Sequence, residues 1–468
     1  MLTPVNVFRH YVPGQIITRL LGDLLLLAIV LSGGNWIWLL VLGLPPIWVG
    51  NPPLLPKAAI FALLGILMFS FAGLYDYTQR VSGKELLIRT MAAGPAWWIA
   101  YDVIAFFLPA LQLSRFALSL GVGFGTLGII GTRELYALHP SVSRVRERLL
   151  FLGATPLADR LISELDMGHP GYEILGYVDD RPPHQVDLTN GYRVLGTTRE
   201  LQDVVTRTQA GTIVVALAER RGAFPMQAVM DCKLQGVRVE DWPAFYERLT
   251  GKIIVQNLRP SWLIFSEGFV RTRFTRLVKR WTDIALSASF LLLGMPIFLL
   301  VALAIKLDSR GPVFFRQDRV GERGHIFTLR KFRTMATDAE ARTGPVWASE
   351  QDPRATRVGY WLRKTRLDEF PQVINVLKGE MSFIGPRPER ACFVAELQEK
   401  IPYYSQRHTI KPGITGWAQV RYPYGATVKD AEEKLQYDLY YIKNLSFSLD
   451  MRILLSSIQV VLFGKGAR

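Results

Sequence analysis

Long apolar stretches constrain the fold of this chain more than any other feature of its sequence. A helix that crosses a membrane needs about 20 mostly apolar residues. Four stretches near the N-terminus approach that length, at residues 17–40, 58–74, 88–108 and 116–130. Hydrophobic residues make up 49% of the 468 residues, which fits a protein with membrane helices. We therefore expect residues 1–135 to form a membrane region of four transmembrane helices.

Basic residues beside these stretches predict their orientation, because Lys and Arg concentrate in cytoplasmic loops. The loop of residues 43–55 contains no basic residue, whereas the following basic residues flank the next loop or follow the fourth stretch: Arg80, Lys84, Arg89, Arg133, Arg144, Arg146 and Arg148. The N-terminus and everything after residue 133 are therefore expected in the cytoplasm. Asp102 lies within the third stretch. An acid there either serves a function or pairs inside the helix bundle, and we expect the pairing.

A fifth apolar stretch, residues 281–307, differs from the first four. Basic residues stand on both of its sides, at positions 276, 279 and 280 and again at 306 and 310, so both ends favour the cytoplasmic side. Pro296 stands in its middle, where the missing N–H and the ring bend a helix. These features predict a re-entrant helix that enters the membrane, bends and returns. The alternative is a fifth complete span with a kink, which would place all later residues outside the cell.

Residues 145–262 alternate between predicted strands and predicted helices. Strands are expected at residues 148–152, 172–178, 212–217 and 236–239, and such alternation is typical of a parallel sheet. The turn after the first strand keeps only the first glycine of a dinucleotide-binding fingerprint, Gly153, and continues with Thr155 and Pro156. We therefore expect an α/β Rossmann-like domain without NAD, with a structural, regulatory or dimer-forming role. The acids Asp179 and Asp180 either hold a ribose or form a strand-end turn, which is the simpler interpretation.

The chain carries a net charge of +15, which suits nucleic acid, anionic lipid or phosphorylated substrates as partners. No helix-turn-helix, zinc-finger or RNA-recognition pattern is present, so we expect no nucleic-acid partner. Two cysteines, Cys232 and Cys392, cannot build a disulfide framework or a zinc site, and both are expected in the core.

An adjacent acid pair, Asp368 and Glu369, stands among fixed positive charges: Arg363, Lys364, Arg366 and Arg387. Opposite charge nearby keeps carboxylates ionised. Pro371 follows, and the apolar residues after it recur at helical spacing. The pair is therefore expected at or just before a helix N-terminus, which favours anions. This combination predicts a metal-assisted phosphoryl-transfer site, and the alternative is an acidic helix cap with a surface ion-pair cluster.

Four motifs occur in a fixed order around this pair: GPVFFRQDRVGERGHIFTLRKFRTM at residues 311–335, LDEFPQ at 367–372, GEMSFIGPRPE at 379–389 and KPGITGWAQV at 411–420. Through them residues 276–468 resemble the bacterial sugar transferases, the polyprenyl-phosphate glycosyl-1-phosphate transferases. Residues 1–275 resemble the additional N-terminal part of the large members of that monotopic family. The opening VFRHYVPGQ is similar to members associated with exosortase-linked exopolysaccharide systems.

The resemblance implies an α-rich monotopic transferase domain at residues 276–468. Its expected reaction transfers a hexose-1-phosphate from a UDP-sugar to undecaprenyl phosphate, releases UMP and starts exopolysaccharide or O-antigen assembly. Asp368 is implied as the nucleophile that forms a phosphosugar intermediate, while Glu369 binds metal or acts as a base. Mg²⁺ is the expected cofactor, held by both acids, because it prefers oxygen ligands. The best candidates for phosphate contacts are Lys331, Arg333, Arg363 and Arg387, since arginine binds phosphate bidentately.

The resemblance also implies that residues 281–307 form the re-entrant helix of the family, with Pro296 at its bend. Met295 departs from the serine that usually precedes this proline, which leaves the hydrogen bond that supports the bend unassigned. The expected location is the bacterial inner membrane, with the catalytic domain on the cytoplasmic side, and a homodimer is expected. Glucose or galactose is typical of the larger relatives, but the sequence does not identify the sugar.

Two C-terminal segments each have two interpretations. In KPGITGWAQV, Gly413 and Gly416 permit tight turns, and Trp417 suits the membrane interface or a stacked base; the alternative is a packed turn. Residues 435–463 mix apolar and charged groups. They are expected to form helices that lie on the bilayer, with core packing as the alternative.

Two other classes of protein compete with the transferase. The first is a catalytically silent membrane scaffold that binds nucleotide sugars, against which the intact acid pair counts. The second is a membrane-anchored nucleotide-sugar dehydratase, which needs an intact glycine turn and a Tyr-x-x-x-Lys pair. The pair Tyr360 and Lys364 lies far downstream of the Rossmann-like region, which argues against a dehydratase.

Overall fold

The computed structural model describes most of the chain in two compact units, Met1–Thr250 and Gly251–Arg468, and each unit is considered by itself. The described residues are 5–7, 10–12, 14–41, 43, 54–72, 74, 83–138, 146–166, 171–181, 191–217, 224–256, 266, 268–269, 272–336, 354–422, 425 and 427–463. Arg80 and Arg144, which contributed to the predicted orientation, lie outside them.

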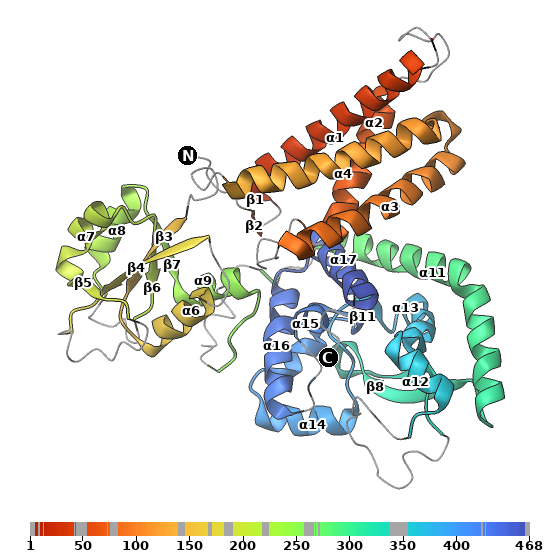
Figure 1. The fold of residues 1–468 in the computed structure, drawn as a ribbon. Coiled ribbons are helices and arrows are strands. Elements are labelled where there is room, and N and C mark those ends of the chain that lie inside the picture. The colour runs from red at the N-terminus through yellow and green to blue at the C-terminus, as the bar shows by residue number, and fades with distance from the viewer. Residues whose placement is uncertain are drawn as a thin grey trace. The chain divides into compact units, whose positions relative to one another are not determined.

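The first unit begins with a short hairpin and four helices. Strand β1 (Val5–Val7) pairs antiparallel with β2 (His10–Val12). The helices are α1 (Gly14–Val41), α2 (Leu54–Phe71), α3 (Gly83–Phe107) and α4 (Arg115–Leu138), with the 3₁₀ turn η1 (Pro109–Leu111) before α4. Helices α1 and α3 each pack against α2 and α4 (Figure 1). Their shared interior is apolar and includes Leu27, Leu31, Phe61, Phe69, Trp97 and Ile129.

Three helices in the described part of the chain are long and apolar enough to cross a membrane. They contain Leu20–Leu40, Arg115–Leu135 and Arg273–Asp308, and the shorter segment Leu54–Ser70 is also apolar. Helix α3, where the third span is predicted, is not among these helices when only the described residues are considered. That helix contains Pro95 and several charged residues, which lower its hydropathy. The apolar helices make the chain a membrane protein.

An ion pair joins α1 to α4. Arg133 Nη2 lies 2.9 Å from Asp23 Oδ2; Asp23 is buried and Arg133 is partly buried. Asp102 was the acid expected to pair inside this bundle, but its carboxylate forms no hydrogen bond or ion pair with any described residue. The ion pair in this bundle therefore involves Asp23 of α1 rather than Asp102 of α3.

The rest of the first unit is built on a five-stranded parallel sheet of β3 (Glu147–Leu152), β4 (Tyr172–Val178), β5 (Val194–Gly196), β6 (Thr212–Val215) and β7 (Arg238–Asp241). Its spatial order, β5-β4-β3-β6-β7, follows the strand order of a Rossmann fold. The predicted parallel sheet is confirmed. Strand β5 was not predicted, because three residues are too few to show a period of two.

Helices cover both faces of this sheet (Figure 1). Helices α7 (Leu201–Thr208) and α8 (Met226–Leu234) lie together on one face, and α6 (Pro156–Asp166) and α9 (Trp242–Thr250) lie together on the other. Residues Leu149 to Leu152 of the central strand are all fully buried, as expected for a parallel strand covered on both sides. Cys232 belongs to this core as predicted, whereas Cys392 in the second unit is exposed.

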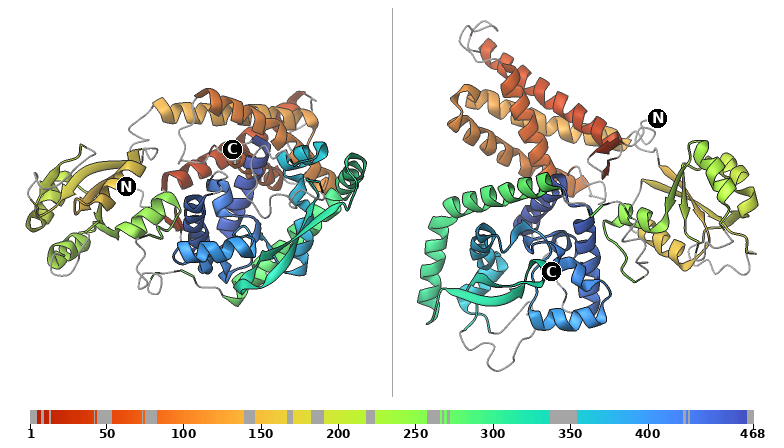
Figure 2. Two further views of the ribbon diagram at one scale, coloured as in Figure 1. Left: turned by 90° about the horizontal axis from the view of Figure 1, so that it is seen from below. Right: turned by 180° about the vertical axis from the view of Figure 1, so that it is seen from behind.

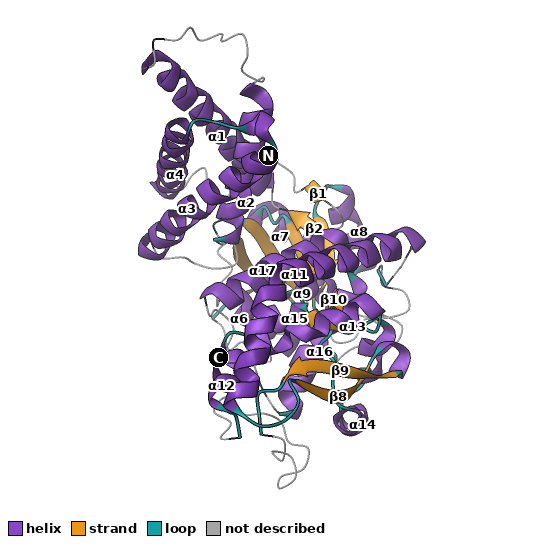
Figure 3. Ribbon diagram, turned by 90° about the vertical axis from the view of Figure 1, so that its right-hand side faces the viewer, coloured by secondary structure: helices purple, strands orange, loops and turns teal. Residues whose placement is uncertain are grey.

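The second unit is mainly helical, with two small two-stranded sheets (Figure 3). Its elements are α11 (Arg273–Asp308), β8 (Phe314–Val320), η4 (Glu322–Gly324), β9 (Ile326–Phe332), α12 (Arg357–Lys364), η5 (Leu367–Gln372), α13 (Val373–Lys378), β10 (Ser382–Ile384), α14 (Ala391–Lys400), η6 (Tyr404–Thr409), β11 (Gly413–Thr415), α15 (Trp417–Arg421), α16 (Val428–Lys443) and α17 (Phe447–Phe463). Strands β8 and β9 form an antiparallel hairpin, and β10 and β11 pair in parallel.

Helix α11 is sharply bent, as Figures 1 and 2 show from opposite sides. It contains 36 residues with Pro296 inside, and proline is the usual cause of such a bend. Both ends of α11 are attached to the same unit. Near its start, Lys279 Nζ donates to Asp450 Oδ2 at 2.9 Å. At its end, Asp308 Oδ2 accepts a hydrogen bond from the backbone N–H of Val358 at 3.0 Å.

The largest core of this unit shows that the C-terminal segment packs inward. Helices α16 and α17 contribute buried Leu439, Tyr441 and Ile453, so core packing, the alternative interpretation, holds for these residues. Trp417 is also buried, with its indole Nε1 donating to the carbonyl of Gly251 at 2.8 Å. It is therefore available neither to a membrane interface nor to a base, and the packed turn is the correct interpretation.

Candidate active site

The acid pair lies on the short 3₁₀ helix η5, which leads directly into α13, so Asp368 and Glu369 precede a helix as the sequence predicts. Arg366, immediately before η5, has a left-handed backbone with φ 60°, which is uncommon for a residue other than glycine. Conformations of this kind cluster at functional sites.

Glu369 is surrounded by cations. Lys331 Nζ and Arg387 Nη2 both donate to its Oε1, at 3.1 and 2.5 Å. Arg387 Nη1 donates to Oε2 at 3.3 Å, and Arg366 Nη1 lies 3.8 Å from Oε1. Burial by itself raises the pKa of Glu369, but the charges of Arg387, Lys331 and Arg366 outweigh burial and hold that pKa well below its ordinary value. Glu369 is therefore firmly ionised.

Asp368 is equally buried but differently surrounded. No group in the described part of the chain donates a hydrogen bond to its carboxylate. Burial raises the pKa of Asp368, Lys331 partly opposes that rise, and the negative charge of Glu369 adds to it. The sequence suggested one shared environment for the pair, whereas the structure separates the two acids. Adjacent carboxylates whose pKa values are pushed apart are suited to different roles.

The segment that carries Arg387 is held at every backbone carbonyl from residue 386 to residue 389. The carbonyls of Pro386 and Glu389 accept hydrogen bonds from the backbone N–H groups of Gly413 and Val320, both at 2.9 Å. Those of Arg387 and Pro388 accept from the guanidinium groups of Arg407 and Arg319, at 2.9 and 3.1 Å. This support fixes the position from which Arg387 reaches Glu369.

Glycines in two of the sequence motifs allow their backbones to touch. A Cβ atom on Gly413 would collide with the backbone N of Gly385, and one on Gly416 would collide with the carbonyl O of Gly385. The strand pairing of β10 with β11 brings these segments together. The backbones of the motifs GEMSFIGPRPE and KPGITGWAQV therefore contact each other next to the segment that carries Arg387.

One of the predicted phosphate-binding residues, Arg333, contacts another part of the unit. Arg333 follows β9, and its guanidinium donates to the carbonyls of Ser309 and Arg310 at 2.7 and 2.9 Å. It therefore caps the C-terminal end of α11 rather than contacting the acid pair. Arg363 lies half-buried on α12. Lys331 and Arg387 are the predicted cations that the structure brings to Glu369.

Two further arginines contribute to the site. Arg366 belongs to the basic run around the pair, and its spacing of three residues from Glu369 is one at which oppositely charged side chains meet along a helix. No sequence pattern predicted a role for Arg407 at the site. Its guanidinium is buried, 3.0 Å from Asp438 Oδ2, and the sequence contains no pattern that relates it to Arg387.

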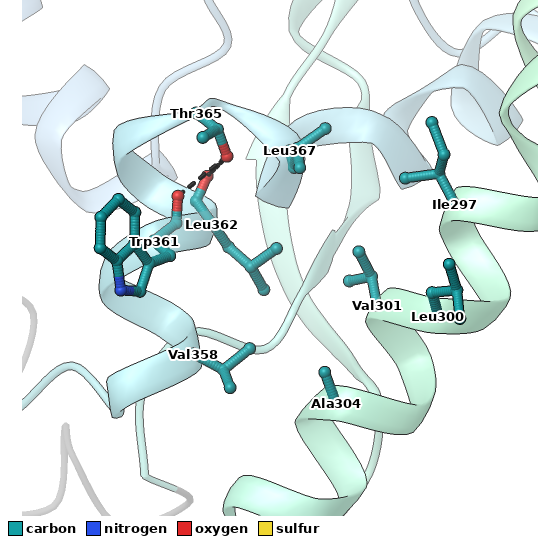
Figure 4. Close-up of a pocket in the computed structure, with 9 residues that line it drawn as sticks. All are labelled: Ile297, Leu300, Val301, Ala304, Val358, Trp361, Leu362, Thr365 and Leu367. Atoms are coloured by element: carbon teal, nitrogen blue, oxygen red, sulfur yellow. Dashed lines mark hydrogen bonds between the residues drawn. The ribbon is translucent and has the colours of Figure 1, made fainter.

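An apolar groove of about 340 Å³ lies between α11 and α12 (Figure 4). Figure 4 shows the part of α11 that follows Pro296 on one side of it and α12 on the other. The lining residues are Ile297, Leu300, Val301, Ala304, Val358, Trp361, Leu362, Thr365 and Leu367. Leu367 immediately precedes Asp368 in the chain, but neither acid lines the groove.

In the Rossmann-like domain, the two acids that could bind a nucleotide, Asp179 and Asp180, form hydrogen bonds within the domain itself. Asp179 Oδ2 accepts the backbone N–H of Ala154 in the glycine turn at 2.7 Å and pairs with Arg181 at 2.8 Å. Asp180 accepts hydrogen bonds from the backbone N–H and hydroxyl of Thr198, at 2.8 and 2.9 Å. These contacts agree with a strand-end turn and leave neither carboxylate directed at a ribose.

Taken together, these features define a class of protein: a membrane protein with a buried acid pair, cations that converge on it, and an apolar groove that is lined in part by the residue before the pair. The sequence profile of the family described as "Bacterial sugar transferase" matches residues 274–464, which include all of these parts. The chain belongs to the bacterial sugar transferase family.

Several curated relatives extend this result. The chain is 30% identical over 470 residues to "Undecaprenyl-phosphate glucose phosphotransferase" of Komagataeibacter xylinus, covering 89% of this chain and 86% of that protein. It is 28% identical to "UDP-glucose:undecaprenyl-phosphate glucose-1-phosphate transferase" of Xanthomonas campestris pv. campestris, covering 93% and 92%. A third relative, "UDP-N-acetylgalactosamine-undecaprenyl-phosphate N-acetylgalactosaminephosphotransferase" of Aeromonas hydrophila, is 41% identical over 51% of this chain and 55% of its own length.

Proposed function

We propose that this protein transfers a hexose-1-phosphate from a UDP-sugar to undecaprenyl phosphate and releases UMP, the first membrane step of exopolysaccharide or O-antigen assembly. One observation carries the proposal: a buried carboxylate without a hydrogen-bond donor in the described structure, Asp368, stands beside an ion-paired one, Glu369. The names of the relatives support this substrate class. They include both glucose and N-acetylgalactosamine, so they do not select one sugar.

In the proposed mechanism Asp368 is the nucleophile. Its carboxylate oxygen attacks the phosphorus that bears the sugar, the bond from that phosphorus to the UMP oxygen breaks, and UMP leaves. An oxygen of undecaprenyl phosphate then attacks the same phosphorus, and the bond to Asp368 breaks, which regenerates the carboxylate. Asp368 suits this role because no hydrogen bond from the described residues has to be broken first. Lys331, Arg366 and Arg387 supply positive charge where the phosphates gather.

Mg²⁺ is the cofactor that we propose for this site. No three His, Cys, Asp or Glu side chains gather as a metal site in the described residues, but Mg²⁺ needs only one or two carboxylates together with water and substrate phosphates. The carboxylate of Asp368 and Oε2 of Glu369 would hold it; among the described residues, this Oε2 accepts only the 3.3 Å bond from Arg387. When bound, the ion would neutralise charge on the diphosphate and the leaving group. The two acids and the three cations would position that diphosphate.

The apolar groove beside Leu367 is the proposed site of the acceptor lipid next to its phosphate. Replacing Ala304 by Phe should fill the groove and raise the KM for undecaprenyl phosphate roughly 10-fold, while the KM for the UDP-sugar stays unchanged. Initial rates measured with each substrate varied in turn would test this.

Ala302→Phe is the matched control. Ala302, like Ala304, lies in the part of α11 that follows Pro296, but it does not line the groove. Both KM values should therefore stay near those of the wild type. An equal increase in the lipid KM for both variants would contradict the assignment of the groove.

The raised pKa of Asp368 leads to a prediction about pH. A nucleophilic carboxylate must be ionised, so activity should fall as the pH drops through a pKa above the ordinary range of an aspartate. Lys331 opposes the rise of that pKa. Lys331→Met should therefore move the acid limb of the kcat profile to higher pH, besides lowering kcat.

Lys400→Met is the control for this measurement, because Lys400 is exposed and pairs only with Glu396 in the described structure. Its profile should match that of the wild type. An acid limb in Lys331→Met that stays in place or moves to lower pH would exclude Asp368 as the group that titrates.

We also propose the finer arrangement of the chain in the membrane. Residues 1–135 would form four spans, residues 145–262 a Rossmann-like cytoplasmic domain and residues 276–468 the monotopic transferase domain of a homodimer. Residues 281–307 would form a re-entrant helix in the bacterial inner membrane, with the catalytic domain on the cytoplasmic side. Three observations support the re-entrant helix: the bend of α11, the position of Pro296, and the attachment of both helix ends to the same unit.

The identity of the released nucleotide tests the proposed reaction. Purified protein in detergent would receive undecaprenyl phosphate and a panel of UDP-sugars, with and without Mg²⁺. UMP released from one sugar is the expected result and would name the donor. UDP would indicate an ordinary glycosyltransferase, and no release beside an active relative would favour the silent scaffold.

A further inference from the structure

Helix η5 presents two apolar residues to the bent helix, one on each side of the acid pair. A 3₁₀ helix has 3.0 residues per turn, so positions i and i+3 lie on the same face. Leu367 and Phe370 occupy such positions, and both belong to an apolar cluster that includes Phe298 and Val301 of α11. Asp368 and Glu369 stand between them and are turned away by about 120° and 240°.

Phe370 contacts α11 on both sides of Pro296. Its ring centroid lies 4.6 Å from that of Phe290 and 5.6 Å from that of Phe298, with interplanar angles of 82° and 66°. Phe290 precedes Pro296 and Phe298 follows it. In a straight helix, positions eight residues apart are separated by about 12 Å along the axis, and a bend brings them toward one ring. We call this inner side of the bend, lined by Phe290 and Phe298, the elbow.

The elbow is also joined to the strands around the site. Phe290 lies 6.2 Å from Phe383 of β10, and Phe298 lies 6.1 Å from Phe332 of β9. Strand β9 carries Lys331, which binds Glu369. The same aromatic cluster therefore contacts the acid-bearing segment and one of the strands that supply its cations.

We propose that Phe370 is a positioning residue: by packing in the elbow of α11, it sets the place of Asp368 and Glu369 relative to the membrane helix. This inference rests on the proposed phosphoryl transfer. Phe370 would act through its neighbours and touch no substrate. The bend of α11 would thereby determine the geometry of catalysis as well as attachment to the bilayer.

Phe370→Ala should lower kcat about 10²-fold, the cost of a small displacement of a reacting group, with the KM for the UDP-sugar within about 2-fold of wild type. Phe370→Leu keeps an apolar side chain, so it should retain more of the kcat and provides a folded variant if the alanine variant is unstable. Phe327→Leu is the matched control. Phe327 is a buried phenylalanine of the same unit in a different cluster, with Val376 and Met381, and its replacement should leave kcat within about 3-fold.

A second measurement tests the elbow without relying on activity. Spin labels at Leu292→Cys and Leu303→Cys, exposed positions before and after Pro296, would report the distance between the two arms of α11, in a background of Cys232→Ala and Cys392→Ser. Phe370→Ala should broaden the distance distribution, and Phe327→Leu should not.

The outcomes separate the inference from the function on which it rests. Lower kcat together with a broadened distribution supports the positioning role. Near-normal kcat, or a lower kcat with an unchanged distribution, overturns it. If the wild-type protein releases no UMP from any donor, the proposed function fails. An unchanged distribution in Phe370→Ala would then still exclude the elbow contact.

Discussion

Asp368→Asn is expected to abolish UMP release, with a loss in kcat of roughly 10⁴-fold or more. An amide cannot attack phosphorus as a carboxylate does, so the first step of the two-step transfer is lost. The fold should persist, because no described residue donates a hydrogen bond to the Asp368 carboxylate. Burial favours the neutral amide over a charge, so the melting temperature should not fall. Nucleotide release and thermal unfolding would be measured on the same preparation.

Asp318→Asn is a matched control for this variant. Asp318 is an exposed acid on β8 whose carboxylate accepts a hydrogen bond from Thr328. It takes no part in the proposed chemistry. Its activity should stay close to wild type. Near-normal turnover by Asp368→Asn would contradict the covalent mechanism. The variant Glu369→Gln would test separately the acid that binds the cations.

Gly413→Ala should destroy the site through the backbone. The new methyl group would overlap the backbone N and Cα of Gly385 and lie 2.5 Å from the carbonyl O of Thr415. The neighbours are backbone atoms, which cannot move aside as a flexible side chain would. The junction of β10 and β11 should open, Arg387 should lose its fixed position, and both activity and melting temperature should fall strongly.

Gly211→Ala provides the comparison, because the added Cβ would meet only ordinary contacts, the nearest at 3.8 Å from the carbonyl O of Arg148. We expect a small change in melting temperature for this variant and no loss of activity. A Gly413→Ala protein with wild-type stability and turnover would show that the close contact of the two motifs is not required.

Much of this molecule follows from local sequence patterns. The parallel sheet was predictable because each of its longer strands is a buried apolar run bounded by a turn. The segment 281–307 was predictable as a bent helix because Pro296 interrupts a long apolar stretch. The position of the acid pair before a helix followed from Pro371 and the apolar residues after it. In each case a few consecutive residues carry the physical cause.

Other features depended on residues that are far apart in the sequence. Lys331 and Arg333 are separated by one position, yet Lys331 binds Glu369 while Arg333 caps α11. In one continuous strand, Lys331 and Arg333 would point to the same face. Strand β9 ends between them, at Phe332, so this alternation of side chains does not reach Arg333. Trp417 looked like an interfacial aromatic, and only the packing of distant segments shows that it is buried.

The sequence by itself determined the membrane character of the chain, its parallel sheet, its family and the place of the acid pair before a helix, since these depend on composition, periodicity and contiguous motifs. Only the tertiary structure decided that Glu369 is ion-paired while Asp368 has no ion pair with a described residue, that Arg407 supports Arg387, and that Phe370 packs against α11 on both sides of Pro296. The physical reason is that burial and charge at a site depend on groups brought in by separate elements. The fold, rather than the spacing of residues along the chain, sets the distances between those groups.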